Sequence, residues 1–351
     1  MKNVEKTISD STPSVLLQHG GNLSAAQAFF PDAPQPWIDL STGINPHAYP
    51  LPSLPPDLWT RLPEPRLIAS LEQAAAAFYR TTAERLVSAS GSQALIQLIP
   101  HIVKGKDVRI FGGSVRLTYT GHQNAWHAAG IEPRIVNTLD ELKGADVAVL
   151  INPNNPDGYL VPPADLLDLA SILHHKGAAL VIDEAFMDFV HPRQSLIPQI
   201  PAQKTLILRS FGKAFGLAGL RIGFAAGSPD MIEPLRALVG FWAVSGPAAF
   251  IGKVVFTDHS WYSTMRDILD QSASRLDRIL LQSSFTLKGG TSLFRLAEHP
   301  EASRLFTHLA AHGILTRPFA DLPGHIRFGI PGSSEEWLRL EQALHRFNKD
   351  I

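Results

Sequence analysis

The sequence predicts an α/β fold, with a mostly parallel sheet between helices in a large domain and a smaller α+β domain. Two patterns predict it: short apolar runs alternate with helical patterns, and from about Trp261 onward the order becomes helix, strands, helix. A chain of 351 residues also exceeds what one hydrophobic core usually serves. We therefore expect an N-terminal arm with part of the small domain in 1–50, the large domain in 51–255 and the small C-terminal domain in 256–351.

Apolar, β-rich runs mark the strands of the large domain, and the segments between them have helical periodicity. The expected strands are Leu86–Ala89, Val108–Phe111, Val147–Ile151, Ala179–Ile182 and Thr205–Leu208. The expected helices are Leu67–Tyr79, Gln93–Ile99, Tyr119–Ala129 and Pro163–His174. Strands joined through helices form right-handed crossovers, so the sheet should be mostly parallel. The proline-rich segment 31–65 should be extended and irregular.

Composition excludes several classes of function. Lys and Arg total 31 against 32 acidic residues, so no large basic excess attracts nucleic acid. The absence of cysteine excludes thiolate chemistry and disulfides and is consistent with the cytoplasm. The segment 1–14 lacks the apolar core of a signal peptide. The uncharged run Ala237–Gly252 is too short for a membrane span and should be a buried helix end and turn. No histidine spacing indicates a metal site, so we expect none.

In parallel sheets, ligands bind at the carboxyl ends of the strands, so the polar residues that follow the apolar runs are the candidates for chemistry. Lys213 follows Thr205–Leu208 in the run Ser-Phe-Gly-Lys. Its amine can attack an aldehyde only when neutral, which requires a desolvated or electropositive site. Ser210 and Arg221 are residue types that bind a phosphate beside such a lysine. The alternative is a solvated lysine on a glycine-rich loop.

Three further strand ends carry candidates. Asp183 ends a buried strand, where a protonated pyridine nitrogen could balance its charge; the alternative is a helix cap or a structural ion pair. Asn155 lies in Asn-Pro-Asn-Asn-Pro-Asp-Gly, which is a turn by composition and also places an amide donor at a strand end. In Ser-Gly-Ser-Gln, Ser92 and Gln93 begin a helix whose free N–H groups suit a phosphate, although many helices begin this way.

The order and spacing of these segments resemble the fold-type I pyridoxal-phosphate enzymes, specifically the class I/II aminotransferases, which implies the aspartate-aminotransferase fold. The resemblance implies that Lys213 carries pyridoxal 5'-phosphate as a Schiff base, while Asp183 and Asn155 bind the pyridine nitrogen and the O3′ oxygen. It further implies residues for three other roles: stacking on the pyridine ring, binding the cofactor phosphate and binding the substrate α-carboxylate. These are Tyr119 for the ring, Ser92, Gln93, Ser210 and Arg221 for the phosphate, and Arg327 for the carboxylate.

The N-terminal motifs narrow the resemblance. His19-Gly-Gly-Asn22, followed by Ser-Thr-Gly-Ile-Asn-Pro, is similar to the threonine-phosphate decarboxylases of cobalamin biosynthesis, which are close to histidinol-phosphate aminotransferases. We expect His19, the Gly20–Asn22 backbone and the Gly43–Asn45 turn, including Asn45, to bind the substrate phosphate, as glycine-bearing segments present N–H groups to an anion. The alternative is an arm that only docks on a neighbouring part of the protein.

Three residues depart from the aminotransferase pattern. Phe186 replaces a tyrosine that bonds O3′, Leu62 replaces a tyrosine that reaches the neighbouring subunit, and Gly212 replaces a hydroxyl residue. Each departure removes a polar contact to the cofactor. Tight cofactor binding and ordinary transamination are therefore both less secure expectations.

The resemblance implies pyridoxal-phosphate-dependent decarboxylation of L-threonine O-3-phosphate to (R)-1-aminopropan-2-yl phosphate and CO₂, in a homodimer. Its substrate would be a small phosphorylated amino acid, with no nucleic acid or membrane partner. The closest rival is an aminotransferase acting on histidinol phosphate or another amino acid. A rival of another class is a non-catalytic binding or regulatory protein with the same fold.

Overall fold

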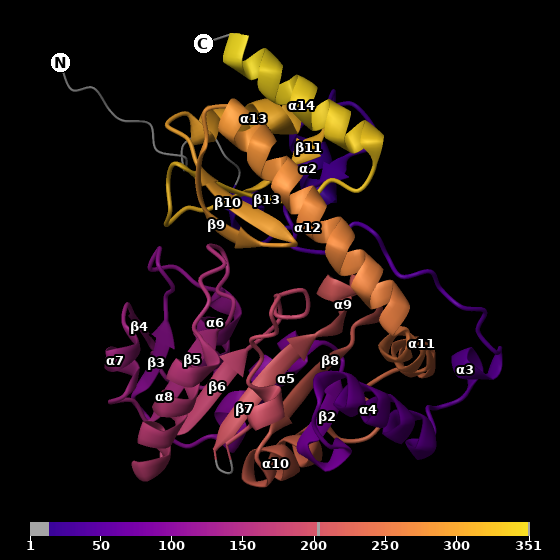
Figure 1. Ribbon diagram of the computed structural model, residues 1–351, viewed down its shortest axis with the longest axis vertical. Helices are drawn as coiled ribbons and strands as arrows, with labels where there is room; N and C mark the ends of the chain where they lie inside the picture. Colours follow the sequence, from indigo (N-terminus) through magenta and orange to yellow (C-terminus); the bar gives the residue numbers. More distant parts are fainter. Residues whose placement is uncertain (1–13, 202–203, 350–351) are drawn as a thin grey trace. The chain divides into compact units, whose positions relative to one another are not determined.

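The structure is a computed structural model that describes residues 14–201 and 204–349 (Figure 1). Its contacts divide the chain into two compact units. The large unit comprises His47–Asn155 and Tyr159–Met265; the small unit comprises the chain up to Pro46, Pro156–Gly158 and the chain from Arg266. The domain boundaries at 50/51 and 255/256 stay predictions, because spatial grouping does not show which segments fold alone.

A seven-stranded sheet of order β2-β8-β7-β6-β5-β3-β4 forms the centre of the large unit. Its strands are β2 (Leu86–Ala89), β3 (Val108–Phe111), β4 (Arg134–Val136), β5 (Val147–Ile151), β6 (Ala179–Asp183), β7 (Thr205–Ser210) and β8 (Gly223–Gly227). The pairs from β7 to β4 are parallel, and β8 is antiparallel to both β7 and β2. The mostly parallel sheet is thus confirmed, and each predicted strand lies within an observed one.

Helices pack on this sheet, and those predicted between the strands are present with shifts of a few residues at their ends. The large unit contains α3 (Asp57–Thr60), α4 (Pro65–Tyr79), α5 (Ser92–Ile102), α6 (Thr120–Ala128), α7 (Leu139–Leu142), α8 (Pro163–His175), α9 (Phe211–Ala214), α10 (Pro229–Val239) and α11 (Gly246–Thr257). Short 3₁₀ turns are η2 (Ala83–Arg85), η3 (Ile197–Gln199) and η4 (Ala218–Leu220).

Two apolar layers hold these helices against the sheet. On one face, α5, α6 and α10 form a continuous core with alternate strand residues, including Ala225 of β8. Phe224, the next residue along β8, belongs to a cluster of aromatic rings with Phe78, Phe211 and Phe256. Because successive strand side chains point to opposite faces, Phe224 and Ala225 anchor the two layers. β5 is buried along its whole length, as expected of a central parallel strand.

Two expectations for irregular or buried segments were wrong in part. Residues 240–243, within Ala237–Gly252, form an exposed loop in which Phe241 is 87% and Trp242 is 60% accessible. The uncharged composition indicated burial, but in this run the buried residues are Val244 and most of those at the start of the flanking helix α11. The proline-rich segment 31–65 is mostly irregular, yet it contains α3 and a two-residue strand β1 (Ile38–Asp39).

The small unit is built around a four-stranded antiparallel sheet of order β12-β13-β10-β9. Its strands are β9 (Thr286–Thr291), β10 (Phe294–Glu298), β12 (Arg317–Pro318) and β13 (His325–Gly329), while β1 pairs in parallel with β11 (Ile314–Leu315). Its helices are α1 (Ser14–Gln18), α2 (Leu23–Phe29), α13 (Ala302–Ala311) and α14 (Ser334–Lys349). The helix α12 (His259–Gln282) begins in residues of the large unit and ends in the small one. The expected α+β character is confirmed.

Candidate active site

A cavity of about 240 Å³ lies in the large unit, among residues that follow the carboxyl ends of its parallel strands. Every residue predicted in this unit to bind the cofactor contributes to its wall. The lining residues are Ser92, Gln93, Tyr119, Ile151, Asn155, Asp183, Ala185, Phe186, Ser210, Lys213 and Arg221. Residues from six separate stretches of the chain thus converge at one place, most of them at the strand ends where they were predicted.

Lys213 lies in α9, the short helix that begins directly after β7. Its Nζ is 3.3 Å from Ser210 Oγ and 5.2 Å from the centroid of the Phe186 ring. The aromatic face of Phe186 therefore lies beside the ammonium group, where it can attract the cation. Gly212 is explained by packing, since a Cβ there would lie 2.6 Å from the Cα of Ala218. The departure at Gly212 lets η4 approach the lysine helix closely.

Asp183 ends β6 and is buried, with 3% of its surface exposed. Its Oδ2 is 3.0 Å from Nε2 of His122, a residue that is itself buried, and its Oδ1 accepts a hydrogen bond from the Ala185 N–H at 3.0 Å. Both carboxylate oxygens therefore have fixed directions. His122 was not singled out from the sequence. The available signal was its place one helical turn after Tyr119.

The start of α5 forms a cradle beside Arg221. Gly91 caps this helix with a φ of +87°, and a Cβ at this position would lie 2.6 Å from Nη2 of Arg221. The first N–H groups of the helix and the guanidinium thus share a space that only glycine leaves open. Nearby, the Tyr119 hydroxyl donates to Gln93 Oε1 at 2.8 Å. Burial and the charge of Asp183 raise the pKa of Tyr119, which keeps the phenol protonated.

In the asparagine-rich turn after β5, some residues stabilise the turn by hydrogen bonds and another lines the cavity. Asn152 donates through Nδ2 to the Val161 carbonyl at 3.1 Å, and its Oδ1 accepts from the Val161 N–H. Asn154 accepts from the Thr118 hydroxyl at 2.6 Å. These two residues fix the turn, and Asn155 lines the cavity. The turn and the functional interpretations of this motif are therefore compatible.

The cavity fits a phosphorylated pyridine aldehyde in its donor set. It combines one amine at Lys213, a carboxylate at Asp183, an aromatic ring at Tyr119, and a helix start with Arg221. A phosphate suits the last pair, because N–H groups at a helix start and a guanidinium both favour an anion. A protonated ring nitrogen suits the buried carboxylate, whose charge otherwise costs desolvation energy. The roles of these residues stay predictions.

The small unit holds the other predicted residues, among them Arg327 in β13. Arg327 is buried, its Nη2 donates to the Ser41 carbonyl at 2.7 Å, and burial lowers its pKa to about 9. Its cross-strand partner in β12 is Arg317, whose pKa burial lowers to about 10. Guanidinium groups remain charged at neutral pH, so the two positive charges are held at an electrostatic cost; the charge of Asp39 offsets part of it, and a further anion would offset more. Arg317 was missed because its pairing with Arg327 is non-local.

Arg317 also organises the N-terminal arm. It donates to the carbonyls of Leu16 and Gln18, at 3.2 and 2.9 Å, directly before the exposed His19. Gly20 packs closely against Ser41: a Cβ on Gly20 would lie 2.3 Å from the carbonyl oxygen of Ser41. The predicted Gly43 and Asn45 are buried in the following loop. Within the small unit, the arm, the loop and Arg327 thus meet around Ser41.

Over residues 14–201 and 204–349, no helix is both long enough and apolar enough to cross a bilayer. Over the same ranges, no group of three or more His, Asp or Glu residues is arranged to hold a metal ion. Leu62, one of the departures noted in the sequence, is 64% exposed on the large unit.

Comparison with known proteins places this site in a family. The chain is 37% identical to a threonine-phosphate decarboxylase of Pseudomonas aeruginosa over 95% of its own length and 99% of the relative's. A Thermus thermophilus aspartate aminotransferase variant has the same fold, with a TM-score of 0.75, 20% identity and full coverage of both chains. A Sinorhizobium meliloti histidinol-phosphate aminotransferase, solved with pyridoxal 5'-phosphate, has a TM-score of 0.75, 19% identity and coverage of 100% of this chain and 98% of its own.

The fold predicted from the sequence, that of aspartate aminotransferase, is thereby confirmed. The family model described as aminotransferase class I and II matches residues 38–347, which include both the cavity of the large unit and Arg327. The chain therefore belongs to the aminotransferase class I and II family.

Proposed function

We propose that this protein is a pyridoxal-phosphate-dependent decarboxylase that converts L-threonine O-3-phosphate to (R)-1-aminopropan-2-yl phosphate and CO₂, a step in building the aminopropanol arm of cobalamin. The observation that carries the proposal is the near full-length similarity, at 37% identity, to a protein named threonine-phosphate decarboxylase. The convergence of the predicted cofactor residues on one cavity supports it.

The proposed cofactor is pyridoxal 5'-phosphate, whose ring when bound accepts the electron pair released from a bond at the substrate Cα. Lys213 would hold it covalently through Nζ. Asp183, oriented by His122, would keep the ring nitrogen protonated, and Asn155 would donate to the ring O3′ oxygen. The phosphate would be held by Ser92, Gln93, Ser210 and Arg221, and Tyr119 would stack on the ring.

The small unit supplies the residues proposed to recognise the substrate. Arg327 would bind the α-carboxylate, and the neighbouring Arg317 adds positive charge for a doubly anionic substrate. His19, the Gly20–Asn22 backbone and the Gly43–Asn45 turn would bind the substrate phosphate. These assignments have support in the burial of Arg327, in the partial burial of Arg317 and in the contact of the arm with Ser41.

The reaction is tested by product analysis with L-threonine O-3-phosphate. Decarboxylation and transamination differ in the bond at Cα that is broken, and the fold supports both. We expect CO₂ and an amine phosphate, with no keto acid formed from the substrate when an amino acceptor is added. Release of a keto acid, or faster turnover of histidinol phosphate, would identify an aminotransferase instead. Absence of turnover with intact cofactor binding would favour a non-catalytic binding protein.

The covalent role of Lys213 is tested separately. Purified protein given pyridoxal 5'-phosphate should absorb visible light, and borohydride should abolish this absorbance and fix the cofactor to the lysine that carries it. Peptide mapping is expected to find the label on Lys213 and not on Lys253, a lysine of α11 in the same unit. A label on any other lysine contradicts the assignment.

We also propose that the protein is a homodimer in the cytoplasm. Exposed apolar side chains support the dimer, because soluble monomers rarely expose large contiguous apolar patches and the exposed rings of Phe241 and Trp242 are adjacent. The exposed large apolar side chains of the large unit include Trp59, Leu62, Phe241 and Trp242. Sedimentation should give twice the mass of the 38.3 kDa chain, and Phe241→Ser should weaken association. A monomer at micromolar concentration contradicts this proposal.

A further inference from the structure

A buried group of charges lies next to the cavity in sequence but does not line it. Arg209 is 3% exposed, Glu184 is fully buried and Asp188 is 4% exposed. The Arg209 guanidinium donates through Nη1 to Glu184 Oε2 at 2.9 Å and through Nη2 to Asp188 Oδ1. The same guanidinium lies over the Tyr79 ring, 4.6 Å from its centroid. We call Arg209, Glu184 and Asp188 the Arg209 clamp.

The clamp is one residue away from the cavity on two neighbouring strands. Glu184 directly follows Asp183 at the end of β6, and Arg209 directly precedes Ser210 at the end of β7. Because successive side chains of a strand point to opposite sides, Arg209 is directed away from the cavity wall that Ser210 forms. The backbone joins the two strands at the same point, since the Glu184 N–H donates to the Leu208 carbonyl at 2.9 Å.

The two carboxylates of the clamp bracket a segment that forms part of the cavity. Between Glu184 and Asp188 lie three residues, and two of them, Ala185 and Phe186, line the cavity. The Ala185 N–H bonds Asp183, and the Phe186 ring lies beside Lys213. A single guanidinium therefore holds both ends of the segment that contacts the two central catalytic candidates.

The charges of the Arg209 clamp are better suited to orienting side chains than to stabilising the fold. Burial raises the pKa of Glu184 and of Asp188, and the positive charge of Arg209 acts against that rise. Such buried charges cost desolvation energy, and apolar residues of similar volume often stabilise a fold as well or better. What apolar residues do not supply is direction: a planar guanidinium bonds two carboxylates at fixed angles. Glu184 is directed further by the Ser195 hydroxyl and the Leu196 N–H.

We propose that the Arg209 clamp is a positioning device that fixes Asp183 and Phe186 against the cofactor and Lys213. The expected effect of the clamp on turnover rests on the proposed function. Its expected effect on the order of residues 185–188 does not. The clamp residues do not line the cavity, so they would act through the cavity residues that they hold. The ammonium of a lysine is a compact charge, and it does not reproduce the two divergent bonds of Arg209.

The test compares Arg209→Lys and Asp188→Asn with wild type in the full-length protein. Arg236→Lys is the matched control, because Arg236 also bonds a largely buried carboxylate, Glu72, at 3.0 Å but has no contact with the segment 184–188. Amide hydrogen exchange, with and without pyridoxal 5'-phosphate, measures how well ordered the segment 184–188 is. The visible absorbance of the bound cofactor reads the surroundings of Lys213, and kcat and KM are measured with L-threonine O-3-phosphate.

We expect amide exchange at 185–188 to rise about tenfold in both clamp variants, with an altered cofactor absorbance and kcat lowered about tenfold at nearly constant KM. Arg209→Met, measured in parallel, should retain less activity than Arg209→Lys. The control should lose melting temperature only. Unchanged exchange at 185–188, or clamp variants that lose melting temperature alone, would overturn the proposal. Altered exchange and absorbance without threonine-phosphate turnover in wild type would keep the clamp and reject the proposed substrate.

Discussion

Because Asp183 ends a buried strand, the sequence predicted that its carboxylate lies in the cavity. The sequence did not predict the residue that orients this carboxylate. The strand Ala179–Asp183 is buried throughout, so its last side chain had to meet a polar partner. His122 supplies one, from a helix 61 residues earlier in the chain. Non-local pairs of this kind, like Arg317 with Arg327, leave no periodic signal in one sequence.

Replacing Asp183 with Asn tests the electronic role assigned to it. The amide has nearly the same shape but does not stabilise a protonated ring nitrogen, so turnover should fall at least about a hundredfold while the cofactor still binds. Steady-state kinetics and the visible absorbance measure the two effects. Asp168→Asn on α8 is the control and should behave as wild type. Near wild-type turnover in Asp183→Asn would show that Asp183 is a structural carboxylate.

His19 tests the substrate assignment, because a phosphate contact and a structural arm have different signatures. Removal of one charge-assisted hydrogen bond to a phosphate should cost about 1.5–3 kcal/mol, or roughly ten- to a hundredfold in kcat/KM. We expect His19→Ala to lose this factor with threonine phosphate and little with unphosphorylated threonine. Equal losses with both compounds, together with a lower melting temperature, would indicate an arm that only docks on the protein.

Among the elements, the central strands were predictable because they are rich in apolar, β-branched residues. Two strands of the large unit, β4 and β8, were not predicted because their sequences give a weaker signal. β5 reads Val-Ala-Val-Leu-Ile and was predicted with its observed bounds. β8 reads Gly-Phe-Ala-Ala-Gly, and β4 has only three residues, so neither stands out from the sequence. Most of the candidate site was predictable to the same extent as the strands, since every cofactor residue except Arg221 ends a strand, follows one or lies at the start of a helix.

The start of α5 allows a test at the scale of one element. In Gly91→Ala, the added Cβ meets the Arg221 guanidinium in the cradle, so pyridoxal-phosphate affinity should fall about tenfold or more. Gly130→Ala is the matched control, because Gly130 also has a positive φ, of +78°, but a Cβ there has no neighbour within 4 Å. Both variants should lose stability; only Gly91→Ala should lose cofactor affinity in a titration of the apoprotein. Equal affinities would remove Gly91 from the phosphate cradle.

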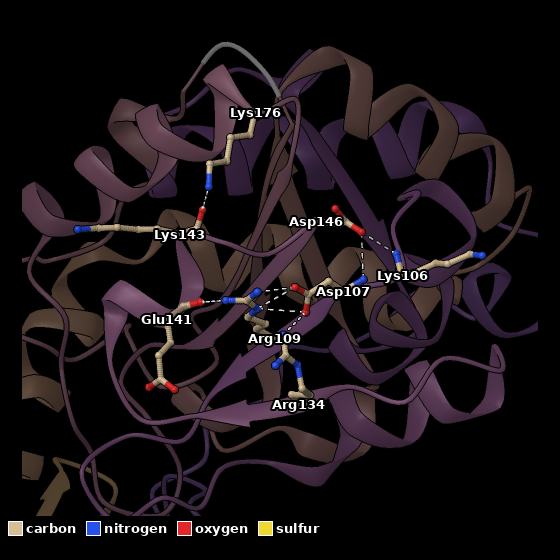
Figure 2. Close-up of polar contacts among 8 residues, drawn as sticks. All are labelled: Lys106, Asp107, Arg109, Arg134, Glu141, Lys143, Asp146 and Lys176. Carbon is tan, nitrogen blue, oxygen red and sulfur yellow. Dashed lines mark hydrogen bonds and ion pairs between the residues drawn. The ribbon is translucent and has the colours of Figure 1, made fainter.

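Across the large unit, the two ends of the sheet carry different kinds of polar residue. The carboxyl ends of the strands carry the cavity, and the amino ends of β3, β4 and β5 carry a network of ion pairs and hydrogen bonds (Figure 2). At its centre, Arg109 of β3 and Arg134 of β4 are register partners, and both donate to Asp107. Asp146, before β5, accepts from the N–H groups of Lys106 and Asp107. This network ties together neighbouring strands far along the sheet from Lys213.

The separation predicts that stability can be changed at one end of the sheet without changing chemistry at the other. The hydrogen bond from Arg109, together with Arg134, lowers the pKa of Asp107 from 3.8 to about 2. In the unfolded chain Asp107 takes up a proton near pH 4, whereas in the folded chain it stays ionised to about pH 2. Its contribution to stability is therefore complete above pH 4 and is lost as the pH falls toward 2.

Asp107→Asn should lower the free energy of unfolding at pH 7 by about 1 kcal/mol, after allowance for the partial exposure of the group. Between pH 4 and pH 2 the variant should show a shallower decline of stability than wild type, because it lacks the group that titrates there. Denaturant titrations across this range measure both effects. Asp57→Asn is the control, since its ion pair with Arg61 is about two-thirds exposed on both sides and should contribute little. Turnover at pH 7 should equal wild type in both variants, and a loss confined to Asp107→Asn would show that the two ends of the sheet are coupled.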